Sequence, residues 1–186
     1  MLKQEQNTRS RSKSKGLSVR EIVIFAMIGA LMFASDIAME ALPNIHLVGT
    51  FIVAATVVYR AKALYPLYVY VFLNGIYGGF SMWWIPYLYV WTVLWGMTML
   101  LPKRMPKWLA PIVYCTVSAL HGIMFGTIYA PAQALLMGFS FEQMLAWIGA
   151  GFYFDVTHAI GNICLGVLIV PMIHTIRLAD RVGKKR

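Results

Sequence analysis

The chain has 186 residues, of which 60% are hydrophobic and only 12% are charged. This composition argues against a water-soluble domain and predicts an integral membrane protein. The formal net charge of +9 is typical of nucleic-acid binding, but the positions of the charges along the chain argue against that function.

Basic residues mark the ends of the apolar stretches. The sixteen lysines and arginines fall at residues 3–20, 60–62, 103–107 and 177–186, and none falls in the apolar stretches between these clusters. Positive charge in membrane proteins collects in the cytoplasmic segments. The pattern therefore predicts an all-α bundle of six transmembrane helices in the cell membrane, with the N- and C-termini in the cytoplasm.

The predicted domain boundaries follow the same change in composition. Residues 1–19 are polar and basic, which predicts a disordered cytoplasmic tail. The membrane domain covers residues 20–177, and a second basic cytoplasmic tail covers residues 178–186. Pro43 ends the first span, and Gly78 and Gly79 end the third. The six expected spans are 21–42, 47–59, 63–80, 83–101, 108–129 and 150–176.

Residues 130–149 do not read as part of a span. Pro131 and Gly138 interrupt the apolar pattern, and the Ser140 hydroxyl can cap a helix that has Glu142 in its first turn. We expect a loop with a short helical element that lies across the outer face between helices 5 and 6. Pro171 is expected to bend the inner end of the sixth helix.

The first span combines small residues with acids. Ala26, Ala30 and Ala34 recur every four residues, a spacing that lets another helix approach closely. Asp36 and Glu40 lie near the outer end of the same span. Acids at that depth are costly unless they are paired or face a water-filled cavity. Two interpretations remain open for these acids, exposure at the membrane surface and a role in a cavity.

The stretch FSMWWIPYLYVWTVLW holds four of the six tryptophans. On a helix, one face would carry Trp84, Tyr87, Trp91 and Trp95. An aromatic belt at the membrane surface explains Trp83 and Trp84, but it does not explain Trp91 and Trp95, which lie deeper. The pattern predicts that Trp84, Tyr87 and Trp91 form a wall for a ring-containing ligand, and that Trp95 serves packing.

A polar stripe in the sixth span faces the same region. Asp155, His158 and Asn162 are spaced as one face of a helix, and Asn74 lies on a polar face of the third span. Asp155 and His158 fit a ligand-binding pair and a structural pair equally well. The polar and aromatic groups fall in the outer half, so we expect an outward-opening pocket. No lysine or arginine reaches it, which disfavours an anionic ligand.

Several chemistries have no motif in the sequence. It contains no G-x-x-x-x-G-K-[ST] loop, no H-E-x-x-H motif and no cysteine cluster, so we expect no nucleotide site, no metal and no cofactor. Thr157 and Ser35 are weak candidates for a nucleophile, so an enzyme is not expected. The chain also lacks the internal repeat of a carrier that has both its own gates.

Taken together, these features resemble the substrate-binding S component of an energy-coupling factor (ECF) type vitamin ABC transporter. The resemblance covers residues 20–177 and includes the alanine row and the segments KALYPLYVYVFL and GTIYAPAQALLMG. It implies a membrane T component and two cytoplasmic ATPase subunits as partners, with Ala26, Ala30 and Ala34 contacting the T component. It also implies that the loaded S component tips over in the membrane and that ATP hydrolysis by the partners drives uptake.

The resemblance places the ligand between the first loop and helices 4 to 6, and the polar face of the third span adds Asn74. The candidate substrate-binding residues are Asn44, His46, Asn74, Trp84, Tyr87, Trp91, Asp155, His158 and Asn162. Cobalamin and a queuosine-type precursor are the leading substrates, with riboflavin, thiamine, folate and pyrimidine precursors open. Two alternatives remain: a polytopic membrane enzyme that acts on a lipid or isoprenoid through Asp36, Asp155 and His158, and a structural subunit without a ligand.

Overall fold

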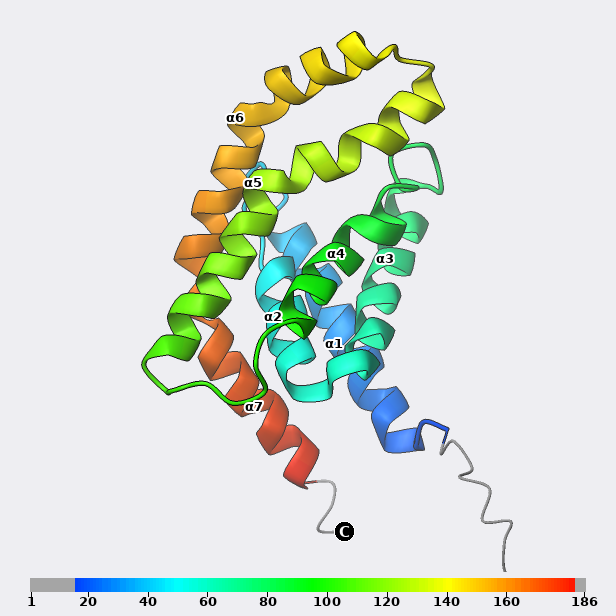
Figure 1. The fold of residues 1–186 in the computed structure, drawn as a ribbon. Helices are drawn as coiled ribbons and strands as arrows, with labels where there is room; N and C mark the ends of the chain where they lie inside the picture. The colour runs from blue at the N-terminus through cyan, green and yellow to red at the C-terminus, as the bar shows by residue number, and fades with distance from the viewer. Residues whose placement is uncertain (1–15, 183–186) are drawn as a thin grey trace, which may run out of the picture.

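The computed structural model of the protein describes residues 16–182. Within that range the chain forms seven α-helices, one 3-10 helix and no strand, which confirms the all-α prediction. The helices pack into an elongated bundle (Figure 1). They are α1 (Val19–Ala38), α2 (Val48–Tyr59), η1 (Arg60–Ala63), α3 (Leu64–Gly78), α4 (Tyr87–Met99), α5 (Leu109–Met137), α6 (Phe141–Gly166) and α7 (Ile169–Val182).

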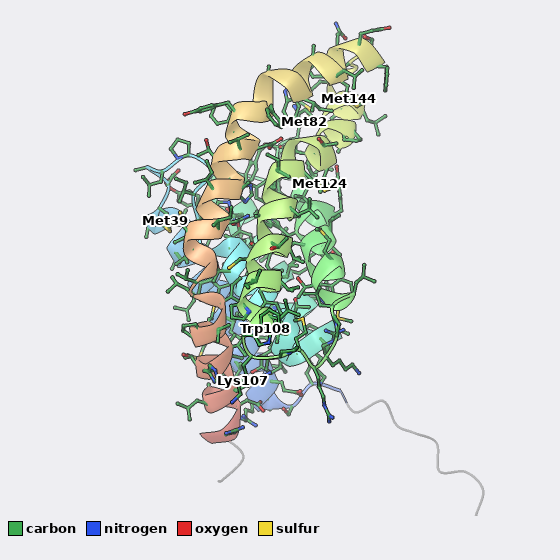
Figure 2. All side chains as sticks on the ribbon, turned by 60° about the vertical axis from the view of Figure 1, so that its left-hand side comes forward. Met39, Met82, Lys107, Trp108, Met124 and Met144 are labelled. Carbon is green, nitrogen blue, oxygen red and sulfur yellow. The ribbon has the colours of Figure 1, made fainter. Side chains whose placement is uncertain are left out.

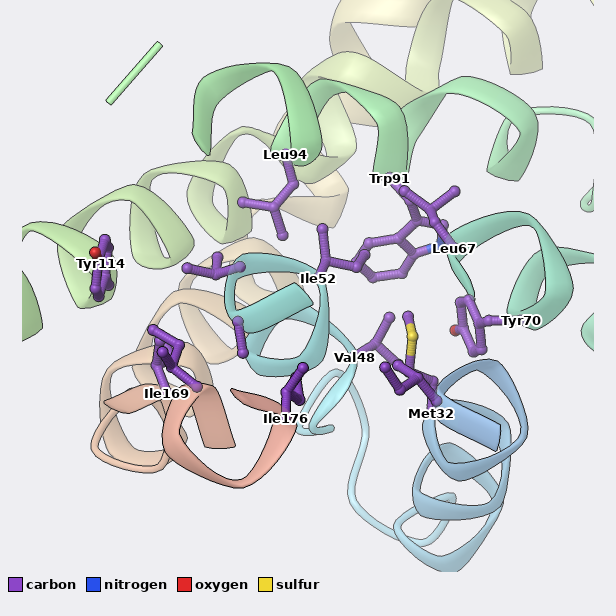
Figure 3. Packing of buried hydrophobic residues seen from close by; sticks show 14 of the residues in the cluster. Met32, Val48, Ile52, Leu67, Tyr70, Trp91, Leu94, Tyr114, Ile169 and Ile176 are labelled. Atoms are coloured by element: carbon purple, nitrogen blue, oxygen red, sulfur yellow. The ribbon is translucent and has the colours of Figure 1, made fainter. Parts of the chain in front are cut away.

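Helix α2 is the centre of the bundle. It is apolar on every side, and eight of its twelve residues are buried, as expected for a helix surrounded by others. It contacts α1, α4, α5, α6 and α7. Figure 3 shows Ile52 of α2 close to Trp91 of α4, with Val48 facing Met32 of α1. The hydrophobic core therefore forms around α2, and α1, α3, α4, α5 and α7 contribute buried residues to this core.

The chain reverses direction between α2 and α3 (Figure 1). Arg60 adopts a positive φ of 54°, a conformation that costs a non-glycine residue about 1–3 kcal/mol. Two hydrogen bonds to α4 and its C-terminal end hold the turn. The Arg60 guanidinium donates to the Met99 carbonyl at 2.6 Å, and the Trp95 indole donates to the Arg60 carbonyl at 3.2 Å. Trp95 therefore serves the fold, as predicted.

One end of the bundle, here termed the basic end, carries the start of α1, η1, the loop 100–108 and the end of α7 (Figure 1). Within residues 16–182, every lysine and arginine falls in these segments. Arg20 pairs with Asp180 at 3.0 Å, and Lys62 pairs with Glu21. The loops 39–47 and 79–86 lie at the opposite end, termed the loop end. Charge is therefore segregated along the bundle, as the sequence predicts.

Helices α5 and α6 differ from their predicted bounds. Helix α5 continues through Pro131 to Met137, and α6 begins at Phe141, so only a three-residue turn replaces the predicted loop at 130–149. Pro131 costs α5 one backbone hydrogen bond without ending it. The turn itself follows the prediction: Gly138 is left-handed, and Ser140 caps α6 through a capping box with Gln143. The two helices lean over the ends of α3 and α4 (Figure 1).

The predicted single span 150–176 is broken. Helix α6 ends at Gly166 and α7 starts at Ile169, with a bend of 56° between them. Pro171 explains the break, because it has no backbone N–H to donate to the carbonyl of Val167 four residues earlier. The bend therefore lies one helical turn before the proline, and it lets α7 turn under the bundle to pack against α2.

By length and composition alone, three helical segments are long and apolar enough to cross a membrane: Val19–Ala38, Val48–Gly78 and Leu109–Met137. Of these, Val48–Gly78 comprises α2, η1 and α3 and includes the reversal at Arg60, so it is not one straight span. The bent pair α6 and α7 adds a fourth if it counts as one span. Taken alone, α4 has 13 residues, fewer than the roughly 20 that cross a bilayer straight. The apolar helices are those of a membrane protein, while six passes and cytoplasmic termini stay predictions. Of the predicted tails, residues 1–15 and 183–186 lie outside the described residues, and residues 178–182 extend α7.

The contact between α1 and α3 depends on Gly29. A Cβ atom there would lie 2.6 Å from Val69 Cβ and 2.8 Å from the Pro66 carbonyl oxygen. We expect Gly29→Ala to lower the free energy of unfolding by about 1–3 kcal/mol, because the backbone of α3 must move. Thermal unfolding in detergent measures the change. Gly96→Ala is the matched control, since a Cβ there meets nothing within 4 Å. Equal melting temperatures for the two variants would contradict this packing.

Candidate ligand-binding site

A cavity of about 340 Å³ opens at the loop end of the bundle. Its walls come from the end of α1, the loop 39–47, the end of α3, Trp83 of the loop 79–86 and single residues of α4, α5 and α6. Polar side chains make up much of the lining, among them Asp36, Glu40, Asn44, His46, Asn74 and His158. Figure 1 places these elements at the end of the bundle that α5 and α6 overhang.

A second cavity of about 400 Å³ adjoins the first, and Asn44, Trp83, Tyr87 and Phe125 line both. Its other walls come from α5 and from the half of α6 that leans over the bundle. They are largely aromatic and include Tyr129, Trp147 and Phe154, with Asp155 as the charged group. Asn44, which lines both cavities, is held by its side-chain amide, which donates to the Phe154 carbonyl at 3.2 Å.

A cluster of rings lies beneath the first cavity. Trp91, with 1% of its surface exposed, lies behind His46 at a ring-centroid distance of 5.5 Å. The rings of His46 and His158 are 4.8 Å apart, and Phe125 lies 5.1 Å from His158. Although several imidazoles meet here, residues 16–182 contain no group of three or more His, Cys, Asp or Glu arranged to hold a metal ion. The cluster is a rigid floor of packed rings.

Several buried polar atoms in and under the two cavities have no hydrogen-bond partner. Buried polar groups in folded proteins are nearly always paired, so an unpaired group calls for a ligand or water. The unpaired atoms of this region are His46 Nδ1, Trp91 Nε1, His121 Nδ1, Asp155 Oδ2 and His158 Nε2. Burial lowers the pKa of the His46 imidazole, against an opposing effect of Asp36, so His46 is neutral at pH 7. These atoms are available to form hydrogen bonds with a ligand or with water.

Three carboxylates line the cavities, and no lysine or arginine is among the lining residues. Asp36 accepts a hydrogen bond from the Tyr70 hydroxyl at 2.9 Å, and Glu40 accepts one from the Tyr77 hydroxyl at 3.3 Å. One oxygen of Asp155 accepts from the Gly126 backbone N–H at 2.9 Å. The site is therefore acidic, and it would repel an anionic ligand.

Six of the nine candidate substrate-binding residues line a cavity. In the first or the second cavity lie Asn44, His46, Asn74, Tyr87, Asp155 and His158. Trp91 supports the floor from behind. Asn162 lies deeper, where its side-chain amide donates to the Ser118 carbonyl at 2.8 Å and joins α6 to α5. The structure thus brings most of the predicted set together from four separate segments, the loop 39–47 and helices α3, α4 and α6.

Trp84, which is predicted to belong to the ligand wall, lines neither cavity. Helix α4 begins at Tyr87, and residues 81–86 form turns, so the helical spacing that aligns Trp84 with Tyr87 does not apply. The Trp84 indole points to α3 and donates to the Val71 carbonyl at 2.8 Å. Trp83, which the sequence assigns to a surface belt, lines both cavities instead, and the Tyr129 hydroxyl donates to its carbonyl at 2.8 Å.

The residues predicted from the sequence do not include the aromatic wall of the second cavity. Phe125 and Tyr129 are four residues apart on α5, and their rings stack at 6.1 Å. Tyr129 stacks in turn on Trp147 of α6 at 5.8 Å with an angle of 13° between the rings. The i, i+4 spacing of Phe125 and Tyr129 was a usable signal. Helical spacing does not predict that Trp147 lines the cavity, because its position depends on the turn between α5 and α6.

The alanine row of α1 lies on the opposite side of that helix from the core. Ala26, Ala30 and Ala34 are all exposed, together with Met27 and Leu31. The buried face of α1 consists of Phe25, Ile28, Gly29 and Met32. The exposed alanines form a shallow strip along α1 that no other helix within residues 16–182 covers.

No family model matches the chain, and neither the curated proteins nor the solved structures include a match.

Proposed function

We propose that this protein is the substrate-binding S component of an ECF-type transporter, which captures a vitamin-like heterocycle from outside the cell. One observation carries the proposal: two adjoining cavities at the loop end are walled by aromatic rings and contain buried polar atoms without partners. Rings and a few unpaired polar groups in a preformed cavity are the usual properties of a small-molecule site.

The size of the cavities favours a small substrate. Volumes of about 340 and 400 Å³ are at the lower end of the range for ligand sites. A queuosine-type precursor, which is a single fused ring system, suits them better than cobalamin, whose corrin ring is much larger. The acidic lining further disfavours folate, which carries carboxylates. Within the family's ligands we therefore propose a compact heterocycle without negative charge.

The proposal includes a membrane topology and partners. Six passes through the cell membrane with cytoplasmic termini would place the basic end inside and the cavities outside, in accord with the positive-inside rule. A membrane T component would contact the exposed alanine strip Ala26, Ala30 and Ala34. Two cytoplasmic ATPases would supply the energy, which accords with the absence of a nucleotide-binding motif from the sequence.

Mass spectrometry of small molecules extracted from the purified full chain tests the proposal most directly. A bound vitamin-like heterocycle, together with copurification of a T component and ATPases, is the expected result. A preparation that carries no such molecule and assembles with no partner would contradict it. Turnover of a lipid or isoprenoid that is lost in Asp155→Asn would favour the membrane-enzyme alternative instead.

Trp83→Ala is expected to weaken ligand binding at least about fivefold, because a stacked ring contributes about 1–3 kcal/mol. Trp108→Ala is the matched control, since Trp108 is 70% exposed and lies away from the cavities (Figure 2). Titration of the copurified molecule against protein stripped of ligand measures both variants. Equal losses in the two variants would place the ligand elsewhere.

A further inference from the structure

The carboxylate of Asp155 is the most unusual group in the second cavity. Only 4% of the residue surface is exposed. One oxygen, Oδ1, accepts the Gly126 N–H at 2.9 Å, while Oδ2 is buried and has no partner. The carboxylate fits against the bare Cα of Gly126, where a Cβ atom would lie 2.5 Å from Oδ2. The sequence of α5 thus makes room for this charge beside the cavity without supplying a counter-ion.

Aromatic rings line the cavity around this carboxylate. Phe125, Tyr129 and Trp147 form a continuous stack along one wall, and Trp83 and Tyr87 meet edge-to-face at 5.4 Å along another. The faces of aromatic rings carry partial negative charge and attract cations within about 6 Å. None of these rings carries a positive charge that would offset the charge of Asp155, and any ring face that a cation reaches would attract it.

An uncompensated buried carboxylate is costly. Removing such an ion from water costs several kcal/mol unless a partner restores the interaction. None of the lining residues of either cavity is a lysine or arginine, and the adjoining cavity adds Asp36 and Glu40, whose hydroxyl partners carry no charge. A bound positive charge would remove the penalty, whereas a neutral ring would leave most of it in place.

We propose that the ligand is a planar heterocycle that carries a positive charge, either a protonated amine or a quaternary nitrogen, and that this group binds between Asp155 Oδ2 and the aromatic walls of the second cavity. The inference rests on the proposed function and narrows its substrate class. The ring of the ligand would extend past Asn44 into the first cavity, where His46 and His158 offer unpaired nitrogens to its polar edge. Each half of the site then recognises a different part of one molecule.

Three probes that share one ring and differ in charge test this inference. Tryptamine is a cation at pH 7, indole-3-acetamide is neutral and indole-3-acetate is an anion. We expect the purified full chain, in an uncharged detergent, to bind tryptamine at least about tenfold more tightly than the acetamide, and the acetate most weakly. Asp155→Asn should reduce tryptamine binding about tenfold or more and change acetamide binding less than about twofold. Isothermal titration calorimetry measures all three.

Two further variants keep the test decisive. Glu142→Gln removes an exposed acid of the same helix that lines neither cavity, and it should leave all three affinities unchanged. Trp147→Leu removes a ring and keeps the carboxylate, so it should weaken tryptamine more than the acetamide, even if Asp155→Asn fails to fold. Equal affinity for tryptamine and the acetamide, an unchanged preference in Asp155→Asn, or no binding of any probe would overturn the inference.

The outcome is separable from that of the proposed function. A T component and a neutral vitamin that copurify with the chain would support the transporter and overturn the charge inference. Selective binding of tryptamine by a chain that assembles with no T component would support the charge inference and contradict the transporter.

Discussion

Trp91→Ala is expected to destabilise the protein by about 3–5 kcal/mol, the cost of removing a large buried aromatic side chain. Trp91 is among the largest fully buried side chains, with 1% exposure. Its indole contacts the core at Tyr70 and the rings of the site at His46 and Tyr87, with centroid distances of 6.0, 5.5 and 5.9 Å. The floor of the first cavity would lose its support, so ligand binding should fall together with stability.

A second substitution at the same position separates packing from recognition. Trp91→Phe keeps a ring and removes the Nε1–H group, which is buried without a partner. We expect a smaller loss of stability than in Trp91→Ala, because less volume is removed. If Nε1 donates to the ligand, binding in Trp91→Phe should fall further than stability alone explains. Thermal unfolding and ligand titration on the same preparations give both values, and unchanged stability in Trp91→Ala would contradict this role.

Much of the fold follows from charge and apolar runs in the sequence. Arg60, Lys62 and Lys107 belong to clusters that mark chain reversals, and the structure collects these clusters at one end of the bundle. The method works because a charge in the apolar interior is costly, so basic residues report which segments lie at a surface. The apolar runs do not give the end of α5. Pro131 predicts a helix end, but α5 continues through it to Met137.

The candidate site shows the limit of helical spacing as a guide. Asp155 and His158 follow the spacing and do line cavities, since α6 is regular at these positions. Trp84 does not line a cavity, because it precedes Pro86 in a segment that forms turns, where helical spacing does not apply. Asn162 lies on the predicted face but one turn too deep, where it bonds to Ser118 of α5. Periodicity gives the face of a helix, while depth and helix ends depend on tertiary contacts.

Ala30→Leu is expected to reduce assembly with a T component at least about tenfold while ligand binding stays unchanged. The alanine strip of α1 is exposed, whereas the neighbouring Gly29 faces α3, so the strip has no packing role within the described chain. Small side chains allow the backbones of two helices to approach closely, and a leucine in the strip would hold the partner helix away. Copurification with a tagged T component measures the loss, and titration of the ligand shows that the site is intact.

Ala146→Leu is the matched control for this effect. It adds the same side-chain volume at an exposed alanine of α6, on the part of the helix that leans over the loop end. Its assembly with the T component should equal that of the wild type. Normal assembly of Ala30→Leu would show that the strip is not the docking face. That result would not contradict ligand binding at the loop end. Loss in Ala30→Leu alone would instead support a partner that binds along α1, away from the cavities at the loop end.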